Sequence, residues 1–269
     1  MDTNRLALSQ VTTPSWGFGE DVTGYLSSGI HAMAVWRDKL DLFGQEEGIE
    51  MLKEYGMKVS SVSDAGYFLR KTRSQTAQAV QDSLIAIDLA RRLEADSLVV
   101  ITGEGGSVFR SADQDRKIVI EAFREIAPYA ESHGVKLAIE AVNGERYPGN
   151  TFLHTIPDVL NILDIIGSPT MGLCFDVDHL WEERDLLEHI RQVSGRIMAV
   201  HLSDMPADPQ PPFDRRLPGG GIVPLSEILN AILDTGYNGF FDLEIFSLDL
   251  WKREYQILLK ESLVAFAQI

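Results

Sequence analysis

The sequence contains little cysteine, little positive charge and no long apolar run, and each shortage excludes a class of protein. Cys174 is the only cysteine, so no disulfide can form within the chain, which fits a reducing compartment. The 24 lysines and arginines face 40 aspartates and glutamates, and a formal charge of −16 repels nucleic acids and anionic lipids. No run approaches the ~20 apolar residues of a membrane span, and the N-terminal MDTNRLALSQ does not resemble a signal peptide. We therefore expect a cytoplasmic protein that binds neither nucleic acid nor membranes, and a homo-oligomer remains compatible with the sequence.

Short apolar runs alternate with longer segments of helical period along the whole chain. Several runs, such as SLVVI and VKLAI, are almost continuously apolar, which is typical of parallel strands buried on both faces. The expected strands are 6–11, 30–36, 57–62, 97–101, 135–141, 171–177, 196–202 and 240–246. The expected helices are 20–28, 41–55, 74–93, 113–132, 156–166, 182–193, 224–234 and 248–267.

Eight such strand-helix units in 269 residues match a (β/α)8 TIM barrel in number and size. No linker, low-complexity tract or change of composition divides the chain, so we expect one domain over residues 1–269. A doubly wound open α/β sheet is the competing arrangement. It would place a glycine fingerprint after the first strand, whereas the sequence there reads TTPSWGFGE.

The last four expected strands each deliver a side chain that can bind a metal ion. In chain order these are Glu140, Asp176, His201 and Glu244. The C-terminal ends of barrel strands meet at one rim, so the four side chains should lie together. Three carboxylates and one imidazole carry a net charge of −3 and require a cation. Mn²⁺ suits this ligand set best, and Mg²⁺, Co²⁺ and Zn²⁺ are alternatives.

Each of these residues taken alone could belong to a solvated loop or cap the next helix. Their occurrence on four consecutive strands favours a shared site instead. Strand alternation turns the apolar neighbours of Glu140 and Glu244 toward the helices, so both glutamates should face the barrel interior. Asp178 is expected one step farther out, in the loop, and without a role in the site.

A long loop, SDMPADPQPPFDRRLPGGG, follows the seventh expected strand. Loops of this length without structure of their own are usually functional, and we expect a mobile lid over a small-molecule site. Arg215 should be exposed in it, so that it acts on substrate rather than on the stability of the fold. The glycines at 219–221 should form a turn rather than bind phosphate. The aromatic residues that follow strand ends, and could pack against a sugar ring, are Trp16, Trp36, Phe109 and Trp181.

Five motifs together resemble the xylose isomerase-like TIM barrel superfamily. They are IEAVN (139–143), CFDVDH (174–179), VHLSD (200–204), DRRLPGGG (214–221) and GYNGFFDLEIF (236–246). Within that superfamily they are similar to the sugar phosphate isomerase/epimerase group, which includes ketose 3-epimerases, hydroxypyruvate isomerase and inosose dehydratase. The resemblance is strong over residues 135–247. As a set the motifs are specific for a metal site and not for a substrate.

The resemblance implies roles for individual residues. Glu140, Asp176, His201 and Glu244 match the divalent-metal ligands of the ketose epimerases, where the two glutamates also exchange protons with the substrate.

The resemblance also implies residues that contact substrate. His179 matches a histidine that contacts substrate, and Arg215 matches the first arginine of the RR-x-P-G loop. Asn143 and Trp36, which lie at or just beyond strand ends, are further candidates for substrate binding. The sequence GERYPGN after Asn143 departs from the epimerase pattern, so Glu145 and Arg146 receive no role.

The expected function is a divalent-metal-dependent isomerase or epimerase of a small, non-phosphorylated keto-sugar, polyol or cyclitol derivative. A metal-stabilised enediolate with carboxylate proton transfer would be the shared intermediate. An inosose dehydratase-like loss of a β-hydroxyl is the alternative outcome. A non-catalytic subunit would tolerate loss of the ligands, yet all four are present. An endonuclease IV-like nuclease would need several more histidine and aspartate ligands.

Overall fold

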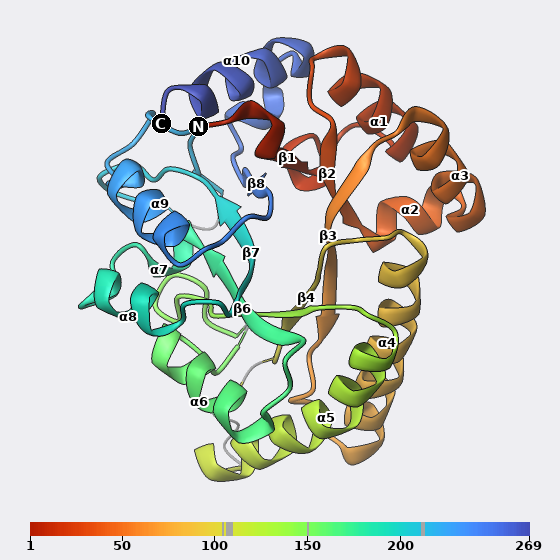
Figure 1. The fold of residues 1–269 in the computed structure, drawn as a ribbon, viewed down its shortest axis with the longest axis vertical. Helices are drawn as coiled ribbons and strands as arrows, with labels where there is room; N and C mark the ends of the chain where they lie inside the picture. Colours follow the sequence, from red (N-terminus) through yellow and green to blue (C-terminus); the bar gives the residue numbers. More distant parts are fainter. Residues whose placement is uncertain (104, 106–109, 150, 211–212) are drawn as a thin grey trace.

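The computed structural model describes residues 1–103, 105, 110–149, 151–210 and 213–269. In this part of the chain eight parallel strands pair in sequence order and close into a barrel, and helices form a ring around it (Figure 1). The strands are β1 Leu6–Ser9, β2 Ala32–Trp36, β3 Lys58–Gly66, β4 Leu98–Ile101, β5 Leu137–Glu140, β6 Met171–Asp176, β7 Ile197–Leu202 and β8 Phe241–Leu243. The expected (β/α)8 TIM barrel is confirmed.

The outer helices begin and end largely where the sequence signals predict. They are α1 Phe18–Ser27, α2 Arg37–Phe43, α3 Gln45–Tyr55, α4 Arg73–Arg92, α5 Ala112–Ser132, α6 Ile156–Ile166, α7 Val177–Leu180, α8 Leu186–Gln192, α9 Leu225–Asp234 and α10 Tyr255–Ala267. Thr72 and Ser111 cap α4 and α5 by accepting hydrogen bonds from Gln75 N and Gln114 N. Such caps satisfy amides that have no partner within the helix.

Several elements differ from the sequence expectation, among them the unexpected short helix α7 and the strand expected over 240–246, which ends at Leu243. The helix expected over 41–55 is divided into α2 and α3 at Gly44, whose φ of 110° lies outside the helical region. The helix expected over 248–267 begins as a separate 3₁₀ turn, Leu250–Lys252, before α10 starts at Tyr255. Strand β3 continues four residues past the expected end at 62, to Gly66, and therefore includes Asp64.

Two layers of apolar side chains hold the barrel together. The larger layer lies between the strands and the helices and includes Phe123 and Phe241, which are fully buried. The inner layer consists of small residues that face the barrel axis, namely Val99, Ala138, Cys174 and Ala199. Cys174 is buried in this inner layer, as its apolar context predicts. The inner layer forms the floor beneath the C-terminal rim.

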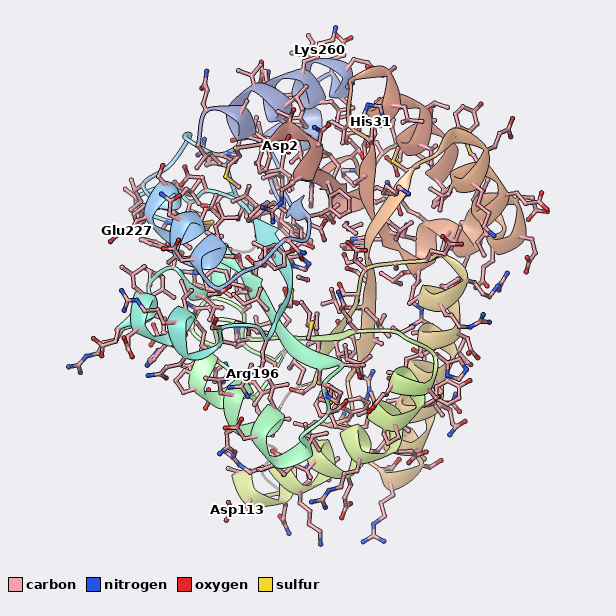
Figure 2. All side chains as sticks on the ribbon, in the orientation of Figure 1. Asp2, His31, Asp113, Arg196, Glu227 and Lys260 are labelled. Atoms are coloured by element: carbon pink, nitrogen blue, oxygen red, sulfur yellow. The ribbon has the colours of Figure 1, made fainter. Side chains whose placement is uncertain are left out.

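Charged side chains cover the outside of the helical ring. Figure 2 shows Asp113, Glu227 and Lys260 at the periphery, on α5, α9 and α10, and all three are exposed. Among the described helices, none combines the length and apolar character needed to cross a membrane.

Candidate active site

Four polar side chains converge at the C-terminal rim of the barrel. β5 ends at Glu140, β6 ends at Asp176, β7 carries His201 one residue before its end, and Glu244 follows β8. Their ligand atoms all lie within 4.8 Å of one another, and all four residues are buried. The sequence expectation that they lie together thus matches the geometry, which follows from parallel strands in register.

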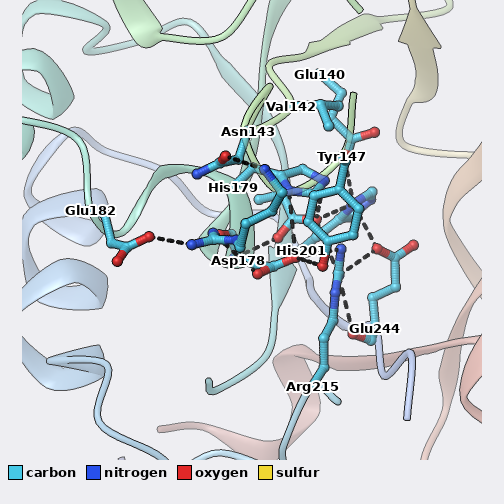
Figure 3. Close-up of polar contacts among 12 residues, drawn as sticks. Glu140, Val142, Asn143, Tyr147, Asp178, His179, Glu182, His201, Arg215 and Glu244 are labelled. Carbon is cyan, nitrogen blue, oxygen red and sulfur yellow. Dashed lines mark hydrogen bonds and ion pairs between the residues drawn. The ribbon is translucent and has the colours of Figure 1, made fainter. Parts of the chain in front are cut away.

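His201 lies at the centre of this cluster. Its Nδ1 is 3.0 Å from Glu140 Oε1, 3.5 Å from Glu244 Oε2 and 3.9 Å from Asp176 Oδ2 (Figure 3). The cluster therefore presents one imidazole nitrogen and three carboxylate oxygens to a common point.

One oxygen of the cluster indicates that a cation fits there. Asp176 Oδ2 is fully buried and accepts no hydrogen bond, whereas Oδ1 accepts one from Asp178 N at 2.8 Å. Arg215 Nη1 lies 3.2 Å from Oδ2 without forming a hydrogen bond with it, and a bound cation would supply the direct partner that this oxygen lacks. Three carboxylates and one imidazole form a donor set suited to a divalent ion that prefers oxygen.

Arg215 is buried inside the site, so the expectation that this arginine is exposed is wrong. Only 3% of its surface is exposed, and its guanidinium lies 2.9 Å from Glu244 Oε2, 3.2 Å from Asp176 Oδ2 and 3.1 Å from Asp178 Oδ2. It also lies over the ring of Phe246, 5.0 Å from the centroid.

Backbone hydrogen bonds hold the loop around Arg215 in place. Arg215 N donates to Phe246 O at 2.9 Å, and Arg216 exchanges two hydrogen bonds with the backbone of Asp204. These contacts join the loop to the segments that follow β7 and β8. They explain why the arginine points inward rather than into solvent.

Asp178 also belongs to the site, contrary to its expected place in an outer loop. It lies in the short helix α7, which begins immediately after Asp176 and turns Asp178 back toward the barrel. The side chain is buried, and its Oδ2 accepts a hydrogen bond from the Tyr147 hydroxyl at 2.6 Å. Arg146 pairs with its Oδ1 at 3.3 Å. Asp178 thus fixes Arg215 and Tyr147 beside the cluster.

A cavity of about 460 Å³ opens above the cluster. Its polar lining includes Glu140, His201, Glu244 and Arg215, together with Asp64 of β3. Its aromatic lining is formed by Trp36, Tyr67, Tyr147, Phe213 and Phe246. This volume is within the range typical of small-molecule sites. The sequence reasoning missed Asp64 because the expected end of β3 left it in a loop.

The residues expected to contact substrate are distributed unequally around the cavity. His179 lines it, with Nε2 3.6 Å from Asp176 Oδ2 and its ring edge-on to Tyr147 at 4.9 Å. Trp36 also lines it and is fixed by a hydrogen bond from Nε1 to Ser9 Oγ at 3.1 Å.

Asn143 lies outside this cavity, in a neighbouring open depression. Its side-chain oxygen accepts hydrogen bonds from Glu145 N and Arg146 N, both at 3.0 Å, so it closes a turn. Trp16 packs edge-on against Tyr255, and Trp181 packs against the main core. Phe109 lies outside the described residues.

The glycine-rich end of the long loop forms a turn, as expected. Gly219 has a φ of 79°, and the Asp204 carboxylate accepts hydrogen bonds from Gly219 N and Gly221 N, both at 2.9 Å. These two amides therefore already have an anionic partner, which leaves them unsuited to bind a phosphate.

Burial and crowding of like charges shift the pKa values in the cluster. Burial raises the pKa of Glu244 to about 7, with Asp176 and Glu140 acting in the same direction and His201 and Arg215 opposing them. Burial alone would raise the pKa of Asp176, but Arg215 and the two histidines hold it below its usual value. Burial alone would lower the pKa of His201, yet Cys174 and the surrounding glutamates raise it well above its usual value.

Arg215→Ala should destabilise the metal-free protein by about 3–5 kcal/mol, because it leaves buried carboxylates without their cation. Arg216→Ala is the matched control, since Arg216 is exposed and its loss should change stability by less than about 0.5 kcal/mol. Urea unfolding of both variants measures the difference. Equal stability of the two variants would contradict the structural role of Arg215.

The chain is similar in sequence to several named enzymes. The D-psicose 3-epimerase of Enterocloster bolteae is 27% identical over 218 residues, which are 77% of this chain and 69% of that enzyme. The inosose isomerase of Bacillus velezensis is 28% identical over 160 residues, 58% of this chain and 54% of that enzyme. The 3-dehydroshikimate dehydratase of Pseudomonas putida is 26% identical over 166 residues, 60% of this chain and 25% of that protein. The match thus spans about half of the inosose isomerase and a quarter of the dehydratase.

Two solved structures share the fold over nearly the whole chain. A protein of Sinorhizobium meliloti 1021 superimposes with a TM-score of 0.94 at 30% identity, and the match covers 99% of this chain and 98% of that one. A zinc-bound IolI protein superimposes with a TM-score of 0.82 at 19% identity, covering 97% of each chain. The second likeness is one of fold alone.

The family model described as xylose isomerase-like TIM barrel matches residues 26–261. This range contains all five motifs on which the resemblance was based, as well as the four clustered side chains at the rim. The chain belongs to the xylose isomerase-like TIM barrel family.

Proposed function

We propose that the protein is a divalent-metal-dependent isomerase or epimerase of a small, non-phosphorylated keto-sugar, polyol or cyclitol derivative. The observation that carries the proposal is the buried cluster of Glu140, Asp176, His201 and Glu244 beside a cavity of about 460 Å³. Relatives of the chain are named as a sugar epimerase and an inosose isomerase, and the chain is an enzyme of this isomerase and epimerase group.

The four clustered residues are the proposed metal ligands. Their three carboxylates favour Mn²⁺, and the zinc in the IolI structure keeps Zn²⁺ as an alternative, with Mg²⁺ and Co²⁺. When bound, a divalent ion would polarise the substrate carbonyl and acidify the neighbouring C–H group.

Glu140 and Glu244 are the proposed proton carriers. Both line the cavity and lie close to His201 of β7, Glu140 at the end of β5, two strands away, and Glu244 just after the adjacent strand β8. One carboxylate would take the proton from the carbon beside the carbonyl, which leaves an enediolate. The other would return a proton to the opposite face, which completes an epimerisation. The pKa of about 7 for Glu244 is close to the value at which a carboxylate can both accept and donate a proton near neutral pH.

Arg215 and His179 are the proposed substrate-contacting residues. Arg215 lines the cavity, and its Nε is buried without a hydrogen-bond acceptor. His179 lines the cavity between the cluster and Tyr147. Both can donate hydrogen bonds to substrate oxygens, and the charge of Arg215 would stabilise the developing enediolate.

A dehydratase is the second candidate function, supported by the likeness to the 3-dehydroshikimate dehydratase. The same enediolate would expel a β-hydroxyl instead of taking up a proton. Incubating the protein with a panel of ketoses and inososes in deuterated water with Mn²⁺ tests both functions, because solvent deuterium on carbon reports the shared intermediate whatever the product.

The purified protein should retain about one divalent ion per chain. Asp176→Asn and His201→Ala should lose it, since each removes one of only four protein ligands. Asp249→Asn, an exposed carboxylate away from the cluster, is the control and should keep its metal. Elemental analysis after dialysis provides the measurement. Stoichiometric metal in His201→Ala would exclude His201 as an essential ligand.

Binding of Mn²⁺ should strengthen as the pH rises from 6 to 8. Glu244 has a raised pKa of about 7 and His201 a pKa well above its usual value, so both hold protons that a divalent ion must displace. Each displaced proton changes the affinity by up to about tenfold per pH unit. Calorimetric titration at pH 6, 7 and 8 measures the slope. Glu244→Gln should give a shallower slope, and a pH-independent affinity of the wild type would refute this coupling.

Glu244→Gln should separate metal binding from proton transfer. Glutamine keeps an oxygen that can bind the metal but cannot accept the substrate proton, so kcat should fall roughly 10²-fold or more. If the enzyme is a two-base epimerase, kcat should fall equally in Glu140→Gln. If it is a one-base isomerase or dehydratase, Glu244→Gln should keep near-normal kcat and Glu140→Gln should not. Glu182→Gln, which lies outside the cavity, is the control. Near-normal kcat in both site variants would eliminate the carboxylate mechanism.

A further inference from the structure

The wall of the cavity formed by β3 carries a polar pair that the proposed proton transfer does not use. Asp64 and Tyr67 both line the cavity, and the Tyr67 hydroxyl donates to Asp64 Oδ2 at 2.5 Å. In a closed barrel of eight strands, β3 lies across from β7, which carries His201. The pair therefore faces the cluster from the far side of the same cavity.

Several contacts aim this pair into the cavity. Tyr67 has a φ of 54°, a conformation that costs free energy in any residue other than glycine. The turn depends on Gly66, because a Cβ there would lie 2.2 Å from Ile101 O. Arg37 holds the backbone of Asp64 by donating to its carbonyl at 3.1 Å, and Asp82 holds Arg37 with two hydrogen bonds of 2.8 Å. Such strain, held by its surroundings, is characteristic of functional positions.

The pair retains hydrogen-bonding capacity for a ligand. The Tyr67 hydroxyl occupies one acceptor position on Asp64, and an ionised carboxylate offers about four. The oxygen of the hydroxyl can itself accept one more hydrogen bond. Two neighbouring acceptors in a half-buried wall suit the O–H groups of a polyhydroxy compound, and Trp36 and Phe246 beside them suit its C–H faces.

The same wall is unsuited to an anion. Among the described residues that line the cavity, Arg215 is the one arginine or lysine, and three carboxylates already surround it. The amides of Gly219 and Gly221 are taken by Asp204. A phosphate placed against Asp64 would meet a like charge. Arg70 lies over the ring of Tyr67, 5.5 Å from its centroid, but does not line the cavity.

We propose that Asp64 and Tyr67 form a second substrate anchor, which binds a hydroxyl group remote from the reacting carbons and restricts the substrate to neutral polyhydroxy ketones. The cluster of Glu140, Asp176, His201 and Glu244 would position the substrate carbonyl. Asp64 and Tyr67 would determine the length and the orientation of the substrate that the cavity accepts. The assignment rests on the proposed function for the identity of the carbonyl end.

The test measures binding by calorimetry, in the presence of Mn²⁺, for the wild type, Asp64→Asn and Tyr67→Phe. The probes are D-fructose and myo-inosose, their monodeoxy analogues, and D-fructose 1- and 6-phosphate. Asp82→Asn tests positioning alone, because Asp82 holds Arg37 beside Asp64 and does not itself line the cavity.

Asp64→Asn should weaken binding of the parent ketone roughly 10- to 100-fold, the usual effect of losing a charged hydrogen bond. One monodeoxy analogue should bind the wild type more weakly than the parent ketone does, by a similar factor. Its affinity should not fall further in Asp64→Asn, because the missing hydroxyl and the substitution remove the same contact. Tyr67→Phe should show the same pattern with a smaller loss. The phosphates should bind the wild type at least about tenfold more weakly than the parent ketone.

Several outcomes would overturn the anchor. If the pair has only a structural role, its substitution would weaken binding of the parent ketone and of every analogue equally. The same selective loss of affinity in Asp82→Asn would show that the effect comes from the position of β3. Equal binding of phosphate and neutral ketone, or no binding of either ketone, would refute the substrate class.

Deuterium exchange on the same samples distinguishes the anchor from the proposed function. If the wild type binds the ketones selectively but exchanges no deuterium, the anchor would stand and the isomerase proposal would be refuted. If Asp64→Asn exchanges deuterium at the wild-type rate and with the wild-type selectivity, the isomerase proposal would stand and the anchor would be refuted.

Discussion

The balance of buried charge at the C-terminal rim is the constraint on which the rest of the site depends. Four carboxylates, those of Glu140, Asp176, Asp178 and Glu244, are at most 6% exposed and lie around one another, and Arg215 is the buried arginine that pairs with three of them. Charges out of water interact strongly, so neither the acids nor the arginine is stable there alone. The raised pKa of Glu244 and the lowered pKa of Asp176 are two consequences of this one balance.

This balance explains features of the chain that appear unrelated in sequence. The loop after β7 delivers Arg215, and Asp204 anchors that loop through Gly219 N and Gly221 N. Helix α7 delivers Asp178, which in turn holds the Arg215 guanidinium 3.1 Å away. The described residues 213–221 of the long loop are therefore bonded to the segments after β7 and β8 and support the site from within.

The sequence was sufficient to predict the barrel and the convergence of the four rim residues. Both follow from local periodicity and from parallel strands, which bring all C-terminal ends to one rim. The burial of Arg215 and Asp178 depends on contacts between distant segments, such as Arg215 N with Phe246 O, and no periodicity records them. Asp64 was missed for a local reason: SSVSDAG lacks the apolar alternation of a strand, yet β3 continues through it to Gly66 because it pairs with β2 and β4.

The two halves of the barrel mouth contribute differently to the chemistry. The half from β5 to the end of β8 presents the four clustered side chains from paired strands, and in the proposed reaction this half would hold the reacting carbonyl. The end of β2, the end of β3 and the turn after it present Trp36, Asp64 and Tyr67, which lie outside the cluster and line the same cavity. An enediolate can be protonated on either of two carbons or lose a β-hydroxyl, and the position of the substrate relative to Glu140 and Glu244 selects among these outcomes. If the proposed function holds, the half formed by β2 and β3 would control the product, because it would fix how the remainder of the substrate lies while the other half handles the proton.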